Sequence, residues 1–182
     1  MQHYLFLFVF LFSCATVQRE SFNVDQKFHR KDWVHWTDDD GDCQNTRQEI
    51  LIARSKEAPL LSENRCRVRS GKWDDYYFPE SLTRSKDVDI DHLIPLKHAH
   101  AAGGSTWSKD KKEKFANDPQ NLVITNRRFN RQKGAKGIYQ WLPSHKDYAC
   151  RYIRDWFIIK NKYDLHVTDQ ESNTLKVSGC SL

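Results

Sequence analysis

Four polar residues in the middle of the chain carry the side chains that a hydrolytic site requires. Asp91 and His92 are adjacent, and Asn121 and Asn130 follow, nine residues apart. The imidazole of His92 can take a proton from water, because the ordinary pKa of histidine, about 6.5, leaves much of it neutral at working pH. The carboxylate of Asp91 and the amide oxygen of Asn130 are hard donors that suit Mg2+ or Mn2+. The sequence therefore predicts water activation beside one divalent ion.

The segments that contain these residues predict two strands followed by a helix. Residues 88–92 alternate in polarity and include β-branched side chains, and residues 122–125 are apolar and β-branched, so both segments are expected to be strands. Asn126 is expected to cap a basic helix over residues 127–133. Adjacent residues of a strand point to opposite sides, so Asp91 and His92 cannot both serve one metal. We therefore assign metal binding to Asp91 and water activation to His92.

Flanking segments predict further helices and one hairpin. We expect Thr46 and Glu49 to form a capping box at the start of a helix, and Ser108 to cap a polar helix that ends near residue 117. We expect a long amphipathic helix after Ser144, and a hairpin over residues 66–73 that turns at Gly71.

Composition indicates one packed domain with a basic surface. Of the 182 residues, 38% are hydrophobic and six are Trp, which is enough to build a core and argues against intrinsic disorder. The formal net charge is +5, which favours polyanionic partners. Charge alone fits nucleic acid, heparin or an acidic membrane surface equally.

Residues 1–17 are interpreted as a cleaved secretory signal. Residues 4–12 are continuously apolar but too short to span a bilayer, and the small residues Ser13 and Ala15 follow around Cys14. A buried N-terminal helix and a lipid-attachment site at Cys14 are the alternatives. We expect a secreted monomer with one domain over residues 18–182 and no membrane segment after cleavage.

Four cysteines remain after such cleavage, and an even number in an exported chain predicts two disulfides. Three pairings are possible, and none of the cysteines has the spacing of a structural zinc site. We favour two pairs that close local loops at the two ends of the domain, Cys43–Cys66 and Cys150–Cys180.

Taken in order, these motifs resemble the HNH, or ββα-metal, nuclease family, in the form whose last motif residue is Asn. The chain is most similar to secreted HNH nucleases related to the C-terminal domain of the GmrSD modification-dependent restriction enzymes. That subgroup has a DIDHxxPL block, an Ala-rich helix with a Trp, an Asn-Leu strand, and Trp-Leu-Pro before a Cys-bearing helix. The matching positions here are 89–96, 99–107, 121–122, 141–143 and 150. The step from Asn121 to Asn130, with Lys133 beyond it, also resembles the HNH domain of CRISPR effector nucleases.

The resemblance implies an α+β fold in which a ββα-metal core is surrounded by helices and stapled by disulfides. It implies that Asp91 and Asn130 bind one Mg2+ or Mn2+ ion, that His92 is the base, and that Asn121 braces the loop bearing the base. The implied reaction is endonucleolytic cleavage of DNA, with RNA as a second candidate substrate, leaving 5′-phosphate ends. Nothing resembles a base-reading module, so we expect little sequence specificity. Four basic residues are expected to hold the sugar-phosphate backbone, namely Arg127, Arg128, Arg131 and Lys133.

Several alternatives stay open at this stage. Asn121 could be only a turn residue, Asp89 could support the metal ligands or be a solvated carboxylate, and the basic run could be a solvated face. His98 and His100 could join His92 at a zinc ion, although surface or capping roles are favoured. The acidic turn at residues 38–42 could bind calcium or be solvated. The alternative function is a catalytically inactive basic module that binds extracellular nucleic acid or glycosaminoglycan.

Overall fold

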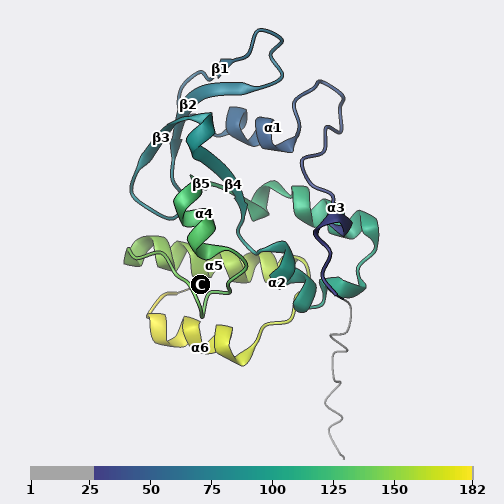
Figure 1. Cartoon of the computed structure of the whole chain (residues 1–182). Helices are drawn as coiled ribbons and strands as arrows, with labels where there is room; N and C mark the ends of the chain where they lie inside the picture. Colours follow the sequence, from purple (N-terminus) through teal and green to yellow (C-terminus); the bar gives the residue numbers. More distant parts are fainter. Residues whose placement is uncertain (1–26, 182) are drawn as a thin grey trace, which may run out of the picture.

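The computed structural model describes residues 27–181, and it has a mixed α+β architecture with two small antiparallel sheets. In Figure 1, the sheet β1–β2–β3 and helix α1 lie at one end, helices α5 and α6 lie at the other, and β4, β5 and α4 lie between them. The strands are β1 Leu60–Leu61, β2 Val68–Asp74, β3 Ser81–Arg84, β4 Val88–His92 and β5 Leu122–Asn126. The helices are α1 Thr46–Ala53, α2 Leu96–Ala101, α3 Lys109–Asn117, α4 Arg127–Lys133, α5 Lys146–Lys162 and α6 Asp169–Ser178.

The predicted strand pair and the helix after it are present. Strands β4 and β5 pair antiparallel in a continuous register that runs from Val88 opposite Asn126 to His92 opposite Leu122. Helix α4 follows β5 directly, and the Asn126 side chain caps it by accepting a hydrogen bond from the backbone N–H of Arg128. Because α4 contacts both strands, residues of the helix and of β4 are brought together.

The alternation of β4 divides its side chains between two faces. Val88 and Ile90 are buried in a core cluster with apolar residues of α1, β2 and β5. Asp89 and Asp91 occupy the intervening positions, and both make contacts with residues of α4. The pleat of one strand therefore separates a face that carries Val88, Ile90 and, at its end, His92 from a face that carries two carboxylates.

A second, larger core cluster is rich in aromatic side chains and lies among α2, α3, α5 and the segments that connect them. Trp33, Phe115, Tyr152 and Trp156 have no exposed surface. Rings in this cluster meet mainly edge-to-face or tilted, as in the pair Tyr152–Trp156, whose centroids lie 5.7 Å apart. This cluster supports β4 from the side of its carboxylates, because Tyr77 belongs to it.

Three local predictions are wrong. Helix α1 is capped by Asn45, whose side chain accepts from Gln48 N–H, so Thr46 is the first helical residue and no capping box forms there. The expected turn at Gly71 is absent, because β2 continues through it with a register irregularity. An added Cβ at Gly71 would lie 2.5 Å from the Trp73 ring, so close packing explains this glycine. The predicted long helix is present as α5, but it begins after His145, which provides no side-chain cap, so Ser144 does not start it.

Other helix predictions are confirmed. Ser108 caps α3 by accepting from Lys111 N–H, and α3 ends at Asn117 as expected. Helix α6 was not predicted from the sequence. It begins with a capping box formed by Thr168 and Glu171.

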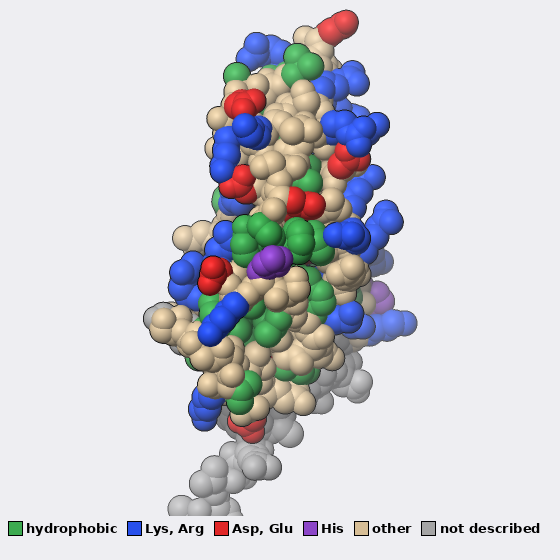
Figure 2. Space-filling model, turned by 90° about the vertical axis from the view of Figure 1, so that its left-hand side faces the viewer, with side chains coloured by type: hydrophobic (Ala, Val, Ile, Leu, Met, Phe, Trp, Pro, Cys, Tyr) green, Lys and Arg blue, Asp and Glu red, His purple; other side chains and the backbone are tan. Residues whose placement is uncertain are grey.

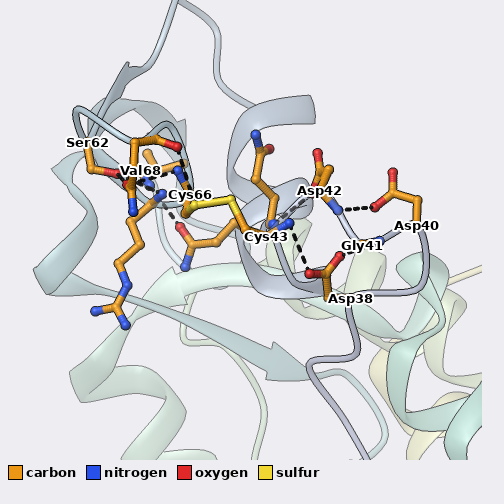
Figure 3. Close-up of a disulfide and its surroundings, with 12 residues drawn as sticks. Asp38, Asp40, Gly41, Asp42, Cys43, Ser62, Cys66 and Val68 are labelled. Atoms are coloured by element: carbon orange, nitrogen blue, oxygen red, sulfur yellow. Dashed lines mark hydrogen bonds between the residues drawn. A yellow bond between two sulfur atoms is a disulfide. The ribbon is translucent and has the colours of Figure 1, made fainter.

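Both predicted disulfides are present. Cys43–Cys66 links the turn before α1 to the segment before β2, and Cys150–Cys180 links α5 to the segment that follows α6. Figure 3 shows Cys43–Cys66 beside the acidic turn.

The signal predicted at residues 1–17 lies outside the described residues, as do residues 18–26. Within residues 27–181, no helix is both long and apolar enough to cross a membrane.

Candidate active site

Asp91 lies at the centre of a buried polar cluster. Its Oδ2 atom accepts a hydrogen bond from the Tyr77 hydroxyl at 2.7 Å and forms an ion pair with Lys133 Nζ at 2.8 Å. Lys133 also donates to the backbone carbonyl of His92 at 2.9 Å. The Lys133 side chain is fully buried and that of Asp91 is 8% exposed, so this ion pair is shielded from water.

Burial and pairing act in opposite directions on this ion pair. Burial raises the pKa of the Asp91 carboxyl above its ordinary value, while the nearby Lys133 ammonium opposes that shift. Burial likewise lowers the pKa of Lys133, and Asp91 opposes that change. Each charge therefore depends on the other for its stability in the interior.

Asp89 and Asn130 form a second contact between β4 and α4, one helical turn before Lys133. Asn130 Nδ2 donates to Asp89 Oδ2 at 3.0 Å, and Arg127 Nε lies 3.3 Å from Asp89 Oδ1. Asp89 is thus not simply solvated, because it links the middle of β4 to α4. Asn130 directs its amide nitrogen to this carboxylate, which leaves its amide oxygen out of the contact.

The donor set around these contacts suits a hard divalent cation. It consists of carboxylate oxygens of Asp89 and Asp91, the amide oxygen of Asn130 and the carbonyl oxygen of His92, with no thiolate among them. The Lys133 ammonium already lies against two of these oxygens, those of Asp91 and His92, which shows that they accept positive charge. By donor type these residues suit Mg2+ or Mn2+, although the contacts shown join Asn130 to Asp89 and Lys133 to Asp91 and do not join Asn130 to Asp91.

His92 follows Asp91 on β4 but has different neighbours. Its Nε2 lies 2.8 Å from the carbonyl oxygen of Ala116, and the rings of Trp36 and His35 lie 5.8 and 5.9 Å from its own, centroid to centroid. A carbonyl can only accept, so Nε2 carries the hydrogen and Nδ1 of the neutral imidazole keeps the lone pair. Burial lowers the pKa of His92 to about 3, so the ring is neutral at pH 7. The neutral imidazole is the form that can accept a proton, and the lowered pKa also makes the ring a weak base in this buried environment.

Asn121 braces the segment that follows His92. Its Oδ1 accepts from Ile94 N–H at 2.9 Å, and its backbone carbonyl accepts from Leu93 N–H at 2.7 Å. The Asn121 side chain is completely buried between these groups. Asn121 therefore holds the backbone of the two residues that follow His92.

The four basic residues of α4 divide into two groups. Arg127, Arg128 and Arg131 are exposed, whereas Lys133 is buried against Asp91 and lies apart from that surface. The face shown in Figure 2 carries Lys and Arg side chains along its edges, with hydrophobic side chains, some acidic groups and a His nearer its centre. Arg128 and Arg131 remain available to a polyanion, Arg127 is exposed but also contacts Asp89, and Lys133 serves the buried carboxylate.

The zinc alternative fails on geometry. His98 pairs with Glu171 at 3.1 Å, and His100 packs beside Phe28 and Trp33, so neither turns towards His92. Among residues 27–181, the only group of three His, Cys, Asp or Glu side chains close enough to share an ion is the exposed set Asp38, Asp40 and Asp42.

The carboxylates of that acidic turn make hydrogen bonds to its own backbone. Asp38 accepts from the N–H groups of Gly41 and Cys43, each at 3.0 Å, and Asp40 accepts from Asp42 N–H (Figure 3). These bonds explain the turn without an ion.

Sequence reasoning missed Tyr77, the Ala116 carbonyl, and the rings of Trp36 and His35. Tyr77 is 14 residues before Asp91, and Ala116 is 24 residues after His92. The aromatic cluster at residues 33–36 was visible in the sequence, but no spacing rule connects it to His92. Only the folded chain identifies these partners.

Residues 45–176 match the family described as GmrSD restriction endonucleases, C-terminal domain. The matched range contains Asp91, His92, Asn121 and Asn130. An uncharacterized secreted protein of Arthroderma benhamiae is 35% identical over 151 residues, which make up 81% of this chain and 72% of the relative. No solved structure matches the chain.

Proposed function

The chain belongs to the family of GmrSD restriction endonuclease C-terminal domains, and we propose that it is a secreted endonuclease that hydrolyses DNA with a divalent metal ion. RNA is a second candidate substrate. The name of the Arthroderma benhamiae relative supports secretion. The two disulfides also favour an oxidising compartment.

One observation carries the proposal: α4 follows β5 directly and contacts the carboxylate-bearing face of β4. This arrangement places Lys133 on Asp91 and Asn130 on Asp89, so the acidic strand and the amide-bearing helix face each other. The arrangement supports the assignment of β4, β5 and α4 as a ββα-metal core. His92 ends the same strand that carries Asp91.

In this proposal Asp91 and Asn130 hold one Mg2+ or Mn2+ ion through a carboxylate and an amide oxygen. The bound ion would supply positive charge to the phosphate as its oxygens become more anionic. Two protein oxygens make a sparse site, and Lys133 already compensates the charge of Asp91. We therefore expect weak metal affinity in the absence of substrate.

His92 acts as the general base. Its Nδ1 takes the proton from the attacking water, because Nε2 is committed to the Ala116 carbonyl. That bond orients the ring, and Asn121 holds the backbone immediately beyond it. The exposed Arg127, Arg128 and Arg131 contact the sugar-phosphate backbone, and such contacts carry no sequence information.

Cleavage of supercoiled plasmid tests the function directly. With Mg2+ we expect nicking that stops in EDTA and that falls at least about 100-fold in the His92→Ala variant, the lower end of the usual contribution of a general base. His145→Ala is the matched control, because His145 is an exposed histidine outside the cluster. Circular dichroism should show that both variants are folded.

Two outcomes would contradict the proposal. Undiminished cleavage by purified His92→Ala would remove the proposed base. Absence of cleavage by the wild-type chain on DNA and RNA across Mg2+, Mn2+ and Zn2+, together with retained DNA binding, would favour the inactive binding module instead.

A further inference from the structure

Tyr77 reaches the proposed metal ligand from outside the β4–β5–α4 unit. It lies between β2 and β3, is 1% exposed, and its hydroxyl donates to Asp91 Oδ2 at 2.7 Å. The phenol hydroxyl is the donor in this bond, because an ionised carboxylate can only accept. The bond therefore joins the connection between β2 and β3 to the proposed metal ligand.

The position of Tyr77 is fixed at its backbone by a buried aspartate. Asp75 is 1% exposed and accepts hydrogen bonds from the Tyr77 N–H at 2.7 Å and the Phe78 N–H at 3.0 Å. The same carboxylate accepts from the Thr125 hydroxyl and the Asn126 N–H at the end of β5. Asp75 thus attaches the Tyr77 segment to the strand that pairs with β4.

The ring of Tyr77 is fixed by aromatic neighbours. The rings of Trp141 and Tyr152 lie 5.0 and 5.5 Å from it, both edge-to-face. With its backbone and ring both held, the hydroxyl has little freedom to move away from Asp91. Such a donor restricts the carboxylate at small entropic cost.

The two side-chain contacts of Asp91 share one oxygen. Tyr77 and Lys133 both meet Oδ2, and neither contact uses Oδ1. When one oxygen of a carboxylate is held in place, the direction in which its second oxygen points is also fixed. The contacts therefore define which lone pairs of Asp91 are left for a ligand.

We propose that Tyr77 is a positioning residue, whose hydroxyl holds Oδ2 of Asp91 so that Oδ1 is presented to the divalent ion. This inference rests on the proposed function, because it needs Asp91 to be a metal ligand. Hydrogen bonds to ligating groups commonly change metal affinity by about 10- to 100-fold. Tyr77 then sets metal affinity without touching the ion or the substrate.

The test is the Mn2+ dissociation constant of the full secreted chain, with disulfides intact, measured by electron paramagnetic resonance and by calorimetry without nucleic acid. We expect Tyr77→Phe to bind Mn2+ about 10-fold more weakly than the wild type. Tyr152→Phe is the matched control, because its buried hydroxyl has no hydrogen-bond partner among residues 27–181 and its ring packs on Tyr77. That variant should stay within twofold of the wild type.

Two further measurements separate positioning from packing. Unfolding curves in EDTA should show that both Phe variants are folded, as expected when the ring is retained. In an Asp91→Asn background, Tyr77→Phe should have no further effect on Mn2+ binding, because the carboxylate that it orients is gone.

The inference is overturned if Tyr77→Phe binds Mn2+ as tightly as the wild type, or if both Phe variants weaken binding equally. In either case, if the wild type still cleaves DNA in a metal-dependent manner, the proposed function stands. A wild type that neither binds Mn2+ nor cleaves nucleic acid would remove the proposed function and this inference with it.

Discussion

At the scale of single residues, the most consequential contact is the buried ion pair between Asp91 and Lys133. Lys133 was expected to hold the substrate backbone, because it belongs to a basic run. Its burial changes that expectation, since a fully buried ammonium needs a partner within the protein. In the described structure, Lys133 neutralises the acidic strand, and only the three arginines remain on the surface.

Replacement of Lys133 should be costly because it leaves a buried carboxylate without its counterion. We expect Lys133→Met to lower the free energy of unfolding by about 3–5 kcal/mol at pH 7, the usual loss when one partner of a buried pair is removed. The double variant Asp91→Asn, Lys133→Met should recover part of this loss. Urea unfolding in EDTA measures both values.

Lys136→Met is the control for that experiment, because Lys136 is exposed and its ammonium donates to the Gln132 carbonyl. It should change stability by less than about 0.5 kcal/mol. Strictly additive losses in the double variant would show that Asp91 and Lys133 do not interact energetically.

At the scale of elements, α6 is attached to the rest of the fold through one buried carboxylate. Glu171 has no exposed surface and accepts hydrogen bonds from Trp156 at 2.8 Å and Lys160 at 2.7 Å, both on α5. It also contacts His98 on α2, and it closes the capping box of α6 with Thr168. One side chain therefore joins three helices.

This arrangement predicts a specific loss of stability in acid. Burial by itself raises the pKa of Glu171, but hydrogen bonds from His98, Lys160 and Thr168 outweigh it and lower the pKa to about 2. A carboxyl whose pKa is depressed in the folded state stabilises the fold above its ordinary value of 4.5, and this contribution is lost as pH falls towards 2. This lowering of the Glu171 pKa corresponds to about 3 kcal/mol of stability at pH 7.

Free energies of unfolding measured between pH 7 and pH 2 test this assignment. Glu171→Gln should lower stability at pH 7 and flatten its pH dependence between about 4.5 and 2. Asp169→Asn is the control, because Asp169 is an exposed carboxyl in the same turn. An unchanged slope in Glu171→Gln would show that the acid sensitivity arises elsewhere.

At the scale of the whole molecule, the net charge of +5 makes DNA binding depend on salt. If Arg127, Arg128 and Arg131 contact phosphates, each contact contributes about 0.9 to the slope of log affinity against log salt on duplex DNA. The triple variant to Gln should therefore reduce the magnitude of that slope by about 2 to 3. Fluorescence anisotropy in EDTA measures binding without cleavage.

A control triple variant separates local contacts from net charge. Arg65, Arg67 and Arg69 are exposed residues before and within β2, and their change to Gln removes the same charge. We expect this variant to keep most of the slope. An equal reduction of the salt slope in both triple variants would mean that overall charge, and not the surface of α4, governs binding.

The sequence by itself determined the features that depend on short-range chemistry. The strands around Asp91 and Asn121, the caps at Ser108 and Asn126, and both disulfides were predicted, because alternation, capping and loop closure act over short stretches of chain. Local sequence patterns gave a wrong prediction at Gly71. Glycine is common in turns, but here close packing against the Trp73 ring explains why a glycine lies within β2.

Only the tertiary structure decided the partners of the site residues. The chain has seven Tyr, and nothing local distinguishes Tyr77, which bonds to Asp91 from the connection between β2 and β3. The contact with the Ala116 carbonyl could not be predicted either, because every residue has a carbonyl and only folding brings this one to His92. The burial of Lys133 follows from how α4 packs on β4, which a basic run alone cannot reveal. Side-chain type and spacing define what chemistry is possible, whereas packing between distant segments decides which groups meet.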